Sequence, residues 1–171
     1  MAMNQTVMRE SIDQLVARDR TVNGKLMSLS DIGYRQAGID GGSSLCGADG
    51  HSHHDPVSGE PVIDTRKFPD MEGLVAYGSS KGIGMGWYQN DCGCTEEVEL
   101  QRNYEGDIRS LDHLGFSGVK YDNCAVMRNM SLYASLMNAT GKSFLIENCH
   151  WGVVGETLPT YSSYRESARG H

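Results

Sequence analysis

The sequence predicts an α/β fold, part of a (β/α)8 TIM barrel, from two observations. Short strand-like apolar segments alternate with helical segments at intervals of a few tens of residues, which is typical of βαβ units and a parallel sheet. Each strand candidate is also followed by polar or ionisable side chains, as expected where the carboxyl ends of barrel strands line an active site. These side chains are Asp40; Gln89, Asn90 and Asp91; Asp122 and Asn123; and Glu147, Asn148 and His150.

A doubly wound sheet is the competing interpretation. It is disfavoured because no glycine-rich phosphate-binding loop follows the first strand candidate. A complete barrel needs about 200 residues or more, whereas this chain has 171 residues. The pattern gives four strands and a possible fifth at 161–165. We therefore expect one incomplete domain over 1–171, roughly half a barrel.

The first half of the chain should contain a helix, a strand and a long loop. Apolar positions at helical spacing predict a helix over 11–29 with an irregularity at Asn23-Gly24. A short strand follows over 34–40. The segment from Ser43 to about Asp70 is rich in Gly, His, Asp and Pro, which indicates a loop.

The second half should alternate regularly between helices and strands. A helix over 95–114 is expected to begin at Thr95 as N-cap, with Glu96 and Glu97 at the positive end of its dipole and a solvated acidic face that includes Glu99. Gly115 should end it. The other expected elements are helices over 71–80 and 127–139 and strands over 83–88, 118–123 and 143–148.

Composition excludes some classes of function. The hydrophobic fraction of 39% and charged fraction of 22% fit an ordinary globular domain. The net charge of −7 and scattered basic residues argue against nucleic-acid binding. No apolar run approaches the roughly 20 residues needed to span a bilayer. No signal peptide is visible at 1–20, so either the protein is not secreted or its true start is missing; compartment and oligomeric state stay unassigned.

The most informative segment is 119–124, Val-Lys-Tyr-Asp-Asn-Cys. Strand alternation places Lys120 and Asp122 on one face. A neighbouring lysine favours the ionised form of a carboxylate, which a nucleophile requires. A strand-end ion pair without catalytic function explains these residues equally well.

Five segments resemble glycoside hydrolase family 27, the α-galactosidases and α-N-acetylgalactosaminidases. The segment 119–124 is similar to the strand that carries the family's nucleophilic aspartate. The other similar segments, in the family's order, are 33–40, 68–74 with 80–88, 149–152 and 164–167. The resemblance covers about 31–167 and implies strands 2 to 6 of the catalytic barrel.

The resemblance implies retaining hydrolysis of terminal α-linked galactose from a small-molecule or oligosaccharide galactoside, without a cofactor. Asp122 would be the nucleophile, and His150 stands where many members have a sugar-binding glutamate. The other implied sugar-binding residues are Asp40, Trp87, Tyr88, Lys120 and Arg165. For Trp87 and Tyr88, core packing is an equal alternative. The choice between galactose and N-acetylgalactosamine stays open.

The chain also departs from the family. The first-strand motif is absent, and Arg169 occupies the position expected for the acid/base aspartate. Loss of general acid–base assistance typically costs about 10²- to 10⁴-fold in rate. We therefore expect a truncated enzyme with little or no activity alone. A non-catalytic remnant that binds galactosides is the alternative.

Cysteines and histidines give two further expectations. By resemblance, Cys92 or Cys94 should form a disulfide with Cys124; free thiols are the alternative. His51, His53 and His54 with Asp55 have metal-ligand chemistry, but ligands at helical spacing do not accompany them. We expect a polar rim loop without metal, whose histidines would line the sugar entrance, and keep a metal-binding module as a third hypothesis.

Overall fold

The computed structural model describes residues 3–47, 52–90, 92, 94, 96, 98–122 and 126–149. Its helices and strands, in order, are α1 (Gln5–Val16), β1 (Arg20–Val22), β2 (Lys25–Met27), the 3-10 helix η1 (Ser30–Ile32), β3 (Gln36–Ile39), α2 (Met71–Ser80), β4 (Gly84–Tyr88), α3 (Gln101–Leu114), β5 (Gly118–Asp122), α4 (Met130–Ala139) and β6 (Leu145–Cys149). The expected strand at 161–165 lies outside the described residues.

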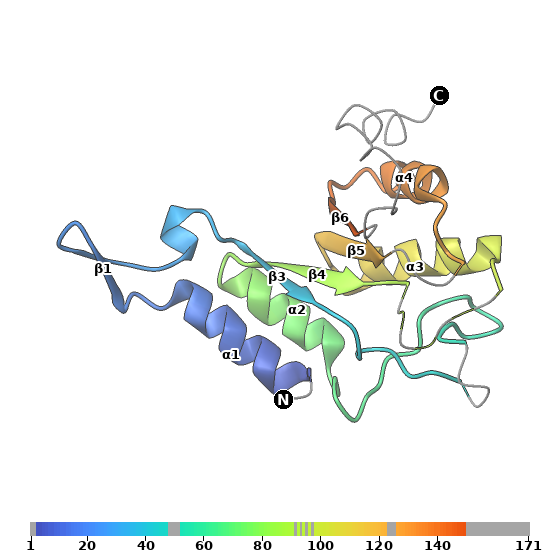
Figure 1. Ribbon diagram of the computed structural model, residues 1–171, viewed down its shortest axis with the longest axis horizontal. Helices are drawn as coiled ribbons and strands as arrows, with labels where there is room; N and C mark the ends of the chain where they lie inside the picture. The colour runs from blue at the N-terminus through green and yellow to red at the C-terminus, as the bar shows by residue number, and fades with distance from the viewer. Residues whose placement is uncertain are drawn as a thin grey trace, which may run out of the picture.

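Four parallel strands form the main sheet, in the order β3-β4-β5-β6. The chain enters these strands in sequence, so spatial and sequence order agree. A helix lies between each of the pairs β3–β4, β4–β5 and β5–β6 (Figure 1). Parallel neighbours need such crossovers because the chain must return to the same sheet end. This is the predicted βαβ arrangement.

The two faces of this sheet differ in composition. One face packs against the helices through alternate residues of β3, β4 and β5, and its core residues include Ile39, Trp87, Val119 and Tyr121. The core also takes Met8 and Ile12 of α1, Leu74 of α2, Leu111 of α3 and Tyr133 of α4. The opposite face carries Gln36, Gly38, Gly86, Gly118, Lys120 and Glu147, which line a common cleft. Period-two alternation therefore separates a helix-covered face from a polar, glycine-rich face.

Helix ends follow local signals. The Asp70 side chain accepts a hydrogen bond from the Gly73 N–H and caps α2, which has the predicted bounds. Gly115 adopts a left-handed conformation and ends α3 as expected. None of the helices in the described ranges is long and apolar enough to cross a bilayer.

The helix predicted over 11–29 is wrong. The helix begins earlier, at Gln5, and ends at Val16, after which β1 and β2 form an antiparallel hairpin. Asn23 and Gly24 both have positive φ angles, 51° and 77°, at the hairpin turn. Asn-Gly is the preferred dipeptide for a two-residue hairpin turn, and this local preference outweighs the apolar spacing. The hairpin lies at the end of the sheet opposite the strand arrowheads (Figure 1).

The helix predicted over 95–114 is shorter than expected. It begins at Gln101, with Leu100 as its N-cap, and Thr95 lies outside the described residues. Glu96 is not on a solvated helix face but is only 5% exposed. Its carboxylate bonds a histidine of the long loop, and this long-range contact replaces the expected helix dipole interaction.

A long loop follows β3 and reaches α2, as predicted. It folds back on itself through isolated antiparallel bridges, Ser44 with Ile63 and His54 with Pro61. It also packs closely on α3: a Cβ atom added to Gly106 would lie 1.9 Å from the Gly59 carbonyl oxygen. Only glycine therefore fits at this helix position.

The predicted disulfide to Cys124 had two candidate partners, Cys92 and Cys94, and the structure excludes one of them. Cys94 bonds to Cys46 of the long loop and not to Cys124. Cys92 is also disulfide-bonded, while Cys124 lies outside the described residues. Cys149 is not part of a disulfide. The Cys46–Cys94 bond ties the long loop to the segment between β4 and α3.

We expect the substitution Leu74→Ala to reduce the free energy of unfolding by about 2–5 kcal/mol, because it leaves a cavity in the core. Leu74 is fully buried in α2. The matched control is Leu26→Ala in the hairpin, where the leucine is 65% exposed. Urea unfolding followed by circular dichroism measures both. Equal losses in the two variants would contradict the described core.

Removing both Cys46 and Cys94 by serine substitution should destabilise the protein by about 4 kcal/mol, from the loop entropy of a 48-residue separation. The double substitution leaves no new unpaired thiol. The control is Cys149→Ser, which removes a thiol that is not part of a disulfide. It should change the free energy of unfolding little. Unfolding of all three proteins in guanidinium chloride tests this, and a stable double variant would argue against the pairing.

Candidate functional site

Three charged side chains meet at the carboxyl ends of β3 and β5. The Lys120 Nζ atom donates a hydrogen bond to Asp40 Oδ1 at 2.9 Å and lies 3.8 Å from Asp122 Oδ2. It also lies 4.9 Å from the centre of the Tyr88 ring, at the end of β4. These four residues come from three neighbouring strands. The structure therefore brings together the predicted residues Asp40, Tyr88, Lys120 and Asp122.

The charges of this group support one another. The hydrogen bond from Lys120 is the main cause that lowers the pKa of Asp40. Burial of Lys120 works against its charged form, but the hydrogen bond to Asp40 and the charges of Asp40 and Asp122 outweigh it and raise the Lys120 pKa. The ammonium group is therefore charged at neutral pH and sits between two carboxyl groups.

Asn90 fixes the backbone of Asp122. Its side-chain oxygen accepts the Asp122 N–H at 2.8 Å, and its side-chain nitrogen donates to the Asp122 carbonyl at 2.7 Å. Asn90 is 1% exposed. Sequence reasoning placed it among the polar residues after a strand but did not select it as a site residue. Its position directly after β4, at the same sheet end as Asp122, was the available signal.

A cleft of about 270 Å³ lies on the polar face of the sheet beside these residues. Asp40, Lys120 and Glu147 line it, and its floor includes the backbone of Gly38, Gly86 and Gly118. Glu147 is the register partner of Lys120 on β6. Adjacent parallel strands place such partners side by side, so Glu147 lies on the cleft next to Lys120, although it was not among the predicted site residues.

Other selected residues lie elsewhere. Trp87 points to the helix-covered face, where it is 1% exposed, stacks on Phe116 and donates to the Ser43 hydroxyl. Its side chain is therefore part of the core and does not face the charged group, because it alternates with Tyr88 along β4. Tyr88 stays near Lys120, and its hydroxyl donates to Cys92 Sγ. His150 and Arg165 lie outside the described residues.

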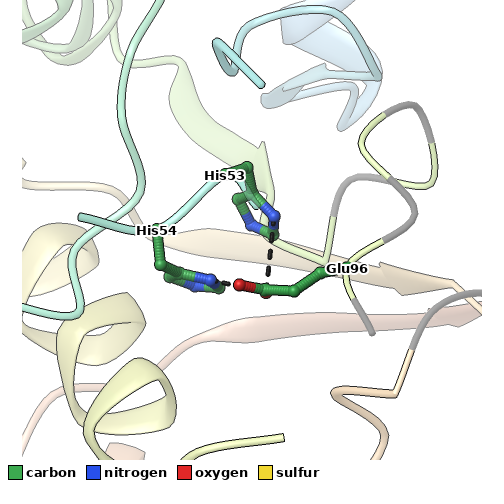
Figure 2. Close-up of side chains that lie close together, drawn as sticks. All are labelled: His53, His54 and Glu96. Atoms are coloured by element: carbon green, nitrogen blue, oxygen red, sulfur yellow. Dashed lines mark hydrogen bonds and ion pairs between the residues drawn. The ribbon is translucent and has the colours of Figure 1, made fainter. Parts of the chain in front are cut away.

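A second cluster is buried between the long loop and α3. His54 Nδ1 lies 2.6 Å from Glu96 Oε2, and His54 Nε2 lies 3.0 Å from Asp107 Oδ1. His53 Nδ1 lies 3.6 Å from the same Glu96 oxygen (Figure 2). His53 and His54 are 1% and 6% exposed. The expected rim loop with histidines at the sugar entrance is therefore wrong for these two residues, while His51 lies outside the described residues.

The two histidines differ in their electrostatics. Burial opposes the charge on His54, but its hydrogen bonds to Asp107 and Glu96 outweigh this effect and raise its pKa to about 9. Burial, and then the charge of His54, lower the pKa of His53. At neutral pH His54 is protonated and His53 is neutral.

Comparison with known proteins identifies relatives. No protein-family model matches the chain. Alpha-galactosidase 3 of Arabidopsis thaliana is 30% identical over 159 residues, which cover 88% of this chain and 33% of that protein. A putative α-galactosidase/melibiase of Bacteroides fragilis superposes with a TM-score of 0.68 at 22% identity, over 97% of this chain and 34% of that one. The α-galactosidase of Saccharomyces cerevisiae with raffinose gives a TM-score of 0.67 at 20% identity, over 88% and 32%.

These similarities agree with the fold and with the sequence motifs. The structural neighbours share the parallel sheet with its helices, so the fold predicted from the sequence, part of an α/β barrel, is confirmed. The chain spans about a third of the length of these relatives. The chain is thus similar to part of the α-galactosidases, in agreement with its motifs that resemble glycoside hydrolase family 27.

Proposed function

We propose that this chain carries the nucleophile side of a retaining α-galactosidase site, with Asp122 as the nucleophile and Lys120 and Asp40 as galactose-binding groups. The observation that supports this most is the convergence of the three side chains at the carboxyl ends of β3 and β5, which flank β4 in the parallel sheet. In barrels, catalytic residues come from the ends of several different strands. The relatives are α-galactosidases, which supports this reaction class for the proposal.

The chemistry assigned to Asp122 is nucleophilic. One of its carboxylate oxygens would form a bond to the anomeric carbon while the bond from that carbon to the leaving oxygen breaks. The leaving oxygen takes up a proton from a second carboxyl group, which afterwards activates water to release the sugar. The double hydrogen bond from Asn90 to the Asp122 backbone would hold the nucleophile in place during this step.

The binding groups offer both kinds of hydrogen bond that a sugar needs. Lys120 has three donors and Asp40 has acceptor oxygens, so the pair can bind neighbouring hydroxyl groups. The Asp40 side chain is 65% exposed and the Lys120 side chain 18% exposed, so both are reachable from the cleft. We propose an oligosaccharide or small galactoside with a terminal α-linked galactose as ligand, because the related yeast structure holds raffinose.

We expect the chain acting alone to lack the carboxyl group that performs the acid/base step. The family resemblance places the acid/base aspartate near position 169, where this sequence has arginine. We therefore propose slow formation and slow breakdown of a covalent galactosyl adduct. A non-catalytic galactoside-binding function is the second candidate, favoured by the same arginine.

Incubation with an activated α-galactoside, such as a dinitrophenyl α-galactoside, should add the mass of one galactosyl unit to Asp122. The activated leaving group makes the missing proton donor unnecessary for the first step. Intact-protein and peptide mass spectrometry measure the adduct. Turnover of an unactivated α-galactoside should stay far below the roughly 1 to 10³ per second of ordinary enzymes.

The variant Asp122→Asn should not form the adduct. Asp19→Asn is the control, since Asp19 is 57% exposed next to the hairpin, and it should label like the unaltered protein. An adduct on another residue would show that Asp122 is not the nucleophile. Binding of galactose without any adduct would favour the non-catalytic function.

Lys120→Met should slow the labelling of Asp122 at low substrate concentration by about 10- to 100-fold. The estimate is the loss of a charge-assisted hydrogen bond of about 1.5–3 kcal/mol. Lys142→Met is the control, because Lys142 pairs with Asp112 outside the cleft. If both variants labelled at the same rate, Lys120 would not contact the sugar.

A further inference from the structure

We propose that His53, His54 and Glu96 form a binding site for a zinc-type divalent cation, through His53 Nδ1, His54 Nδ1 and a carboxylate oxygen of Glu96. These three ligand atoms lie within 4.8 Å of one another, and all three residues are buried. Figure 2 shows the three side chains converging, with the Glu96 carboxylate joined by dashed lines to both histidine rings. The proposal does not depend on the α-galactosidase function.

The first supporting observation is an unpartnered nitrogen. The His53 Nδ1 atom is buried and has no hydrogen-bond partner, although Glu96 Oε2 lies only 3.6 Å away. His53 Nε2 lies 2.7 Å from the Gln89 carbonyl oxygen, which can only accept, so Nε2 carries the proton. In the neutral ring, Nδ1 then directs a lone pair toward a carboxylate oxygen. Glu96 Oε2 accepts from His54 Nδ1 and offers no proton to His53, so a bound cation would supply the partner that His53 Nδ1 lacks.

The second observation concerns the groups that contact the proposed ligands from behind. Metal-binding histidines usually donate their other ring N–H to a carboxylate or a backbone carbonyl, which orients the ring and raises its basicity. His54 contacts the Asp107 carboxylate through Nε2, and His53 contacts the Gln89 carbonyl through Nε2. Asn103 donates from its side chain to the other Glu96 oxygen, Oε1. All three ligands therefore have the supporting contacts that a metal site requires.

Charge and ligand type favour a dication of the zinc type. The buried cluster holds two carboxyl groups, those of Glu96 and Asp107, beside two histidines. A dication with two neutral histidines balances both carboxylates. Two histidines and one glutamate are a known zinc ligand set with an open fourth position for water.

Binding requires one local rearrangement. Ligand atoms about 2.0–2.1 Å from a tetrahedral zinc ion are separated by roughly 3.3 Å. The pair His53 Nδ1 and Glu96 Oε2 is near this distance at 3.6 Å, while the pair His54 Nδ1 and Glu96 Oε2 is at 2.6 Å. The metal replaces the proton of this short hydrogen bond, and the two atoms then move apart. Binding therefore releases a proton and weakens as pH falls.

A metal ion could reach the site from solvent, and once bound it would connect two segments of the chain. His54 and Glu96 line a cleft of about 790 Å³ between the long loop and the start of α3. A bound metal would join the long loop to the segment between β4 and α3, which the Cys46–Cys94 disulfide also joins. Through the Gln89 carbonyl it would also restrain the end of β4, where the Gln89 N–H bonds the Lys120 carbonyl.

The test is zinc binding by the full chain. The protein is freed of metal with a chelator and titrated with zinc sulfate in a calorimeter, with elemental analysis of the dialysed product. We expect one zinc ion per chain and a higher thermal unfolding temperature with zinc than without, because a ligand that binds only the folded state stabilises it. Cobalt(II) in place of zinc should give the visible absorption bands of a four-coordinate site.

The zinc affinity of single-residue variants shows whether His53 binds the metal or only stabilises the fold. His53→Gln keeps a side-chain donor for the Gln89 carbonyl but lacks the imidazole, so it should fold and bind zinc at least tenfold more weakly. His113→Gln alters an exposed histidine near the end of α3 and should bind like the unaltered protein. Asp107→Asn should keep the ion but weaken binding by about 10- to 100-fold. Cys149→Ser removes a thiol that could itself bind zinc. It should leave zinc binding unchanged.

Two results would overturn the proposal. One is the absence of zinc binding at micromolar concentrations by folded, metal-free protein. The other is undiminished binding by His53→Gln, which would place the zinc elsewhere. In either case the cluster would be a hydrogen-bonded contact between the loop and α3, and Asp122 labelling would be unaffected, so failure here is distinguishable from failure of the proposed function.

Discussion

The alternation of side chains along four parallel strands is the constraint on which the rest of this structure depends. β3, β4 and β5 each place one set of residues in the helix layer, and all four strands contribute residues to the polar face of the sheet. The apolar set stabilises the fold through burial, as the fully buried Leu74 and Leu111 beneath the sheet illustrate. The polar set then brings Asp40, Lys120 and Asp122 together without any loop rearrangement.

Stabilisation at the carboxyl end of the sheet comes from cross-links between segments far apart in sequence. The long loop has little regular structure, and it is held by the disulfide at Cys46, by the close approach of Gly59 to α3, and by the ion pairs of His54. Buried charges are tolerated when they are paired and hydrogen-bonded. The described part of the loop is therefore cross-linked to α3 and to the segment between β4 and α3.

The backbone of Gln89 connects the two clusters. Its N–H donates to the Lys120 carbonyl, and its carbonyl oxygen contacts His53. The next residue, Asn90, holds the backbone of Asp122. Two consecutive residues after β4 thus link the buried histidines, the lysine and the proposed nucleophile. A change of protonation or metal binding at His53 and His54 would therefore act on Lys120 and Asp122 through only Gln89 and Asn90.

The sequence by itself determined the features that rest on local periodicity. It predicted the four strands to within about two residues at each end, the bounds of α2 and the end of α3 at Gly115, because apolar spacing, caps and glycine conformation act over a few residues. It also placed Lys120 and Asp122 on one face, since that follows from alternation within a single strand. The hairpin at Asn23-Gly24 also has a local signal, the Asn-Gly turn dipeptide. The helical spacing of the apolar residues around it is a competing local signal, and it led to the wrong prediction.

Only the tertiary structure decided which distant residues meet. The partner of Cys94, the burial of Glu96 against His54, and the contact of Lys120 with Asp40 join positions 48, 42 and 80 residues apart. Trp87 became a core residue and Glu147 a cleft residue through their places on neighbouring strands. Such contacts depend on loop closure and on competition between many possible partners, which local spacing does not encode.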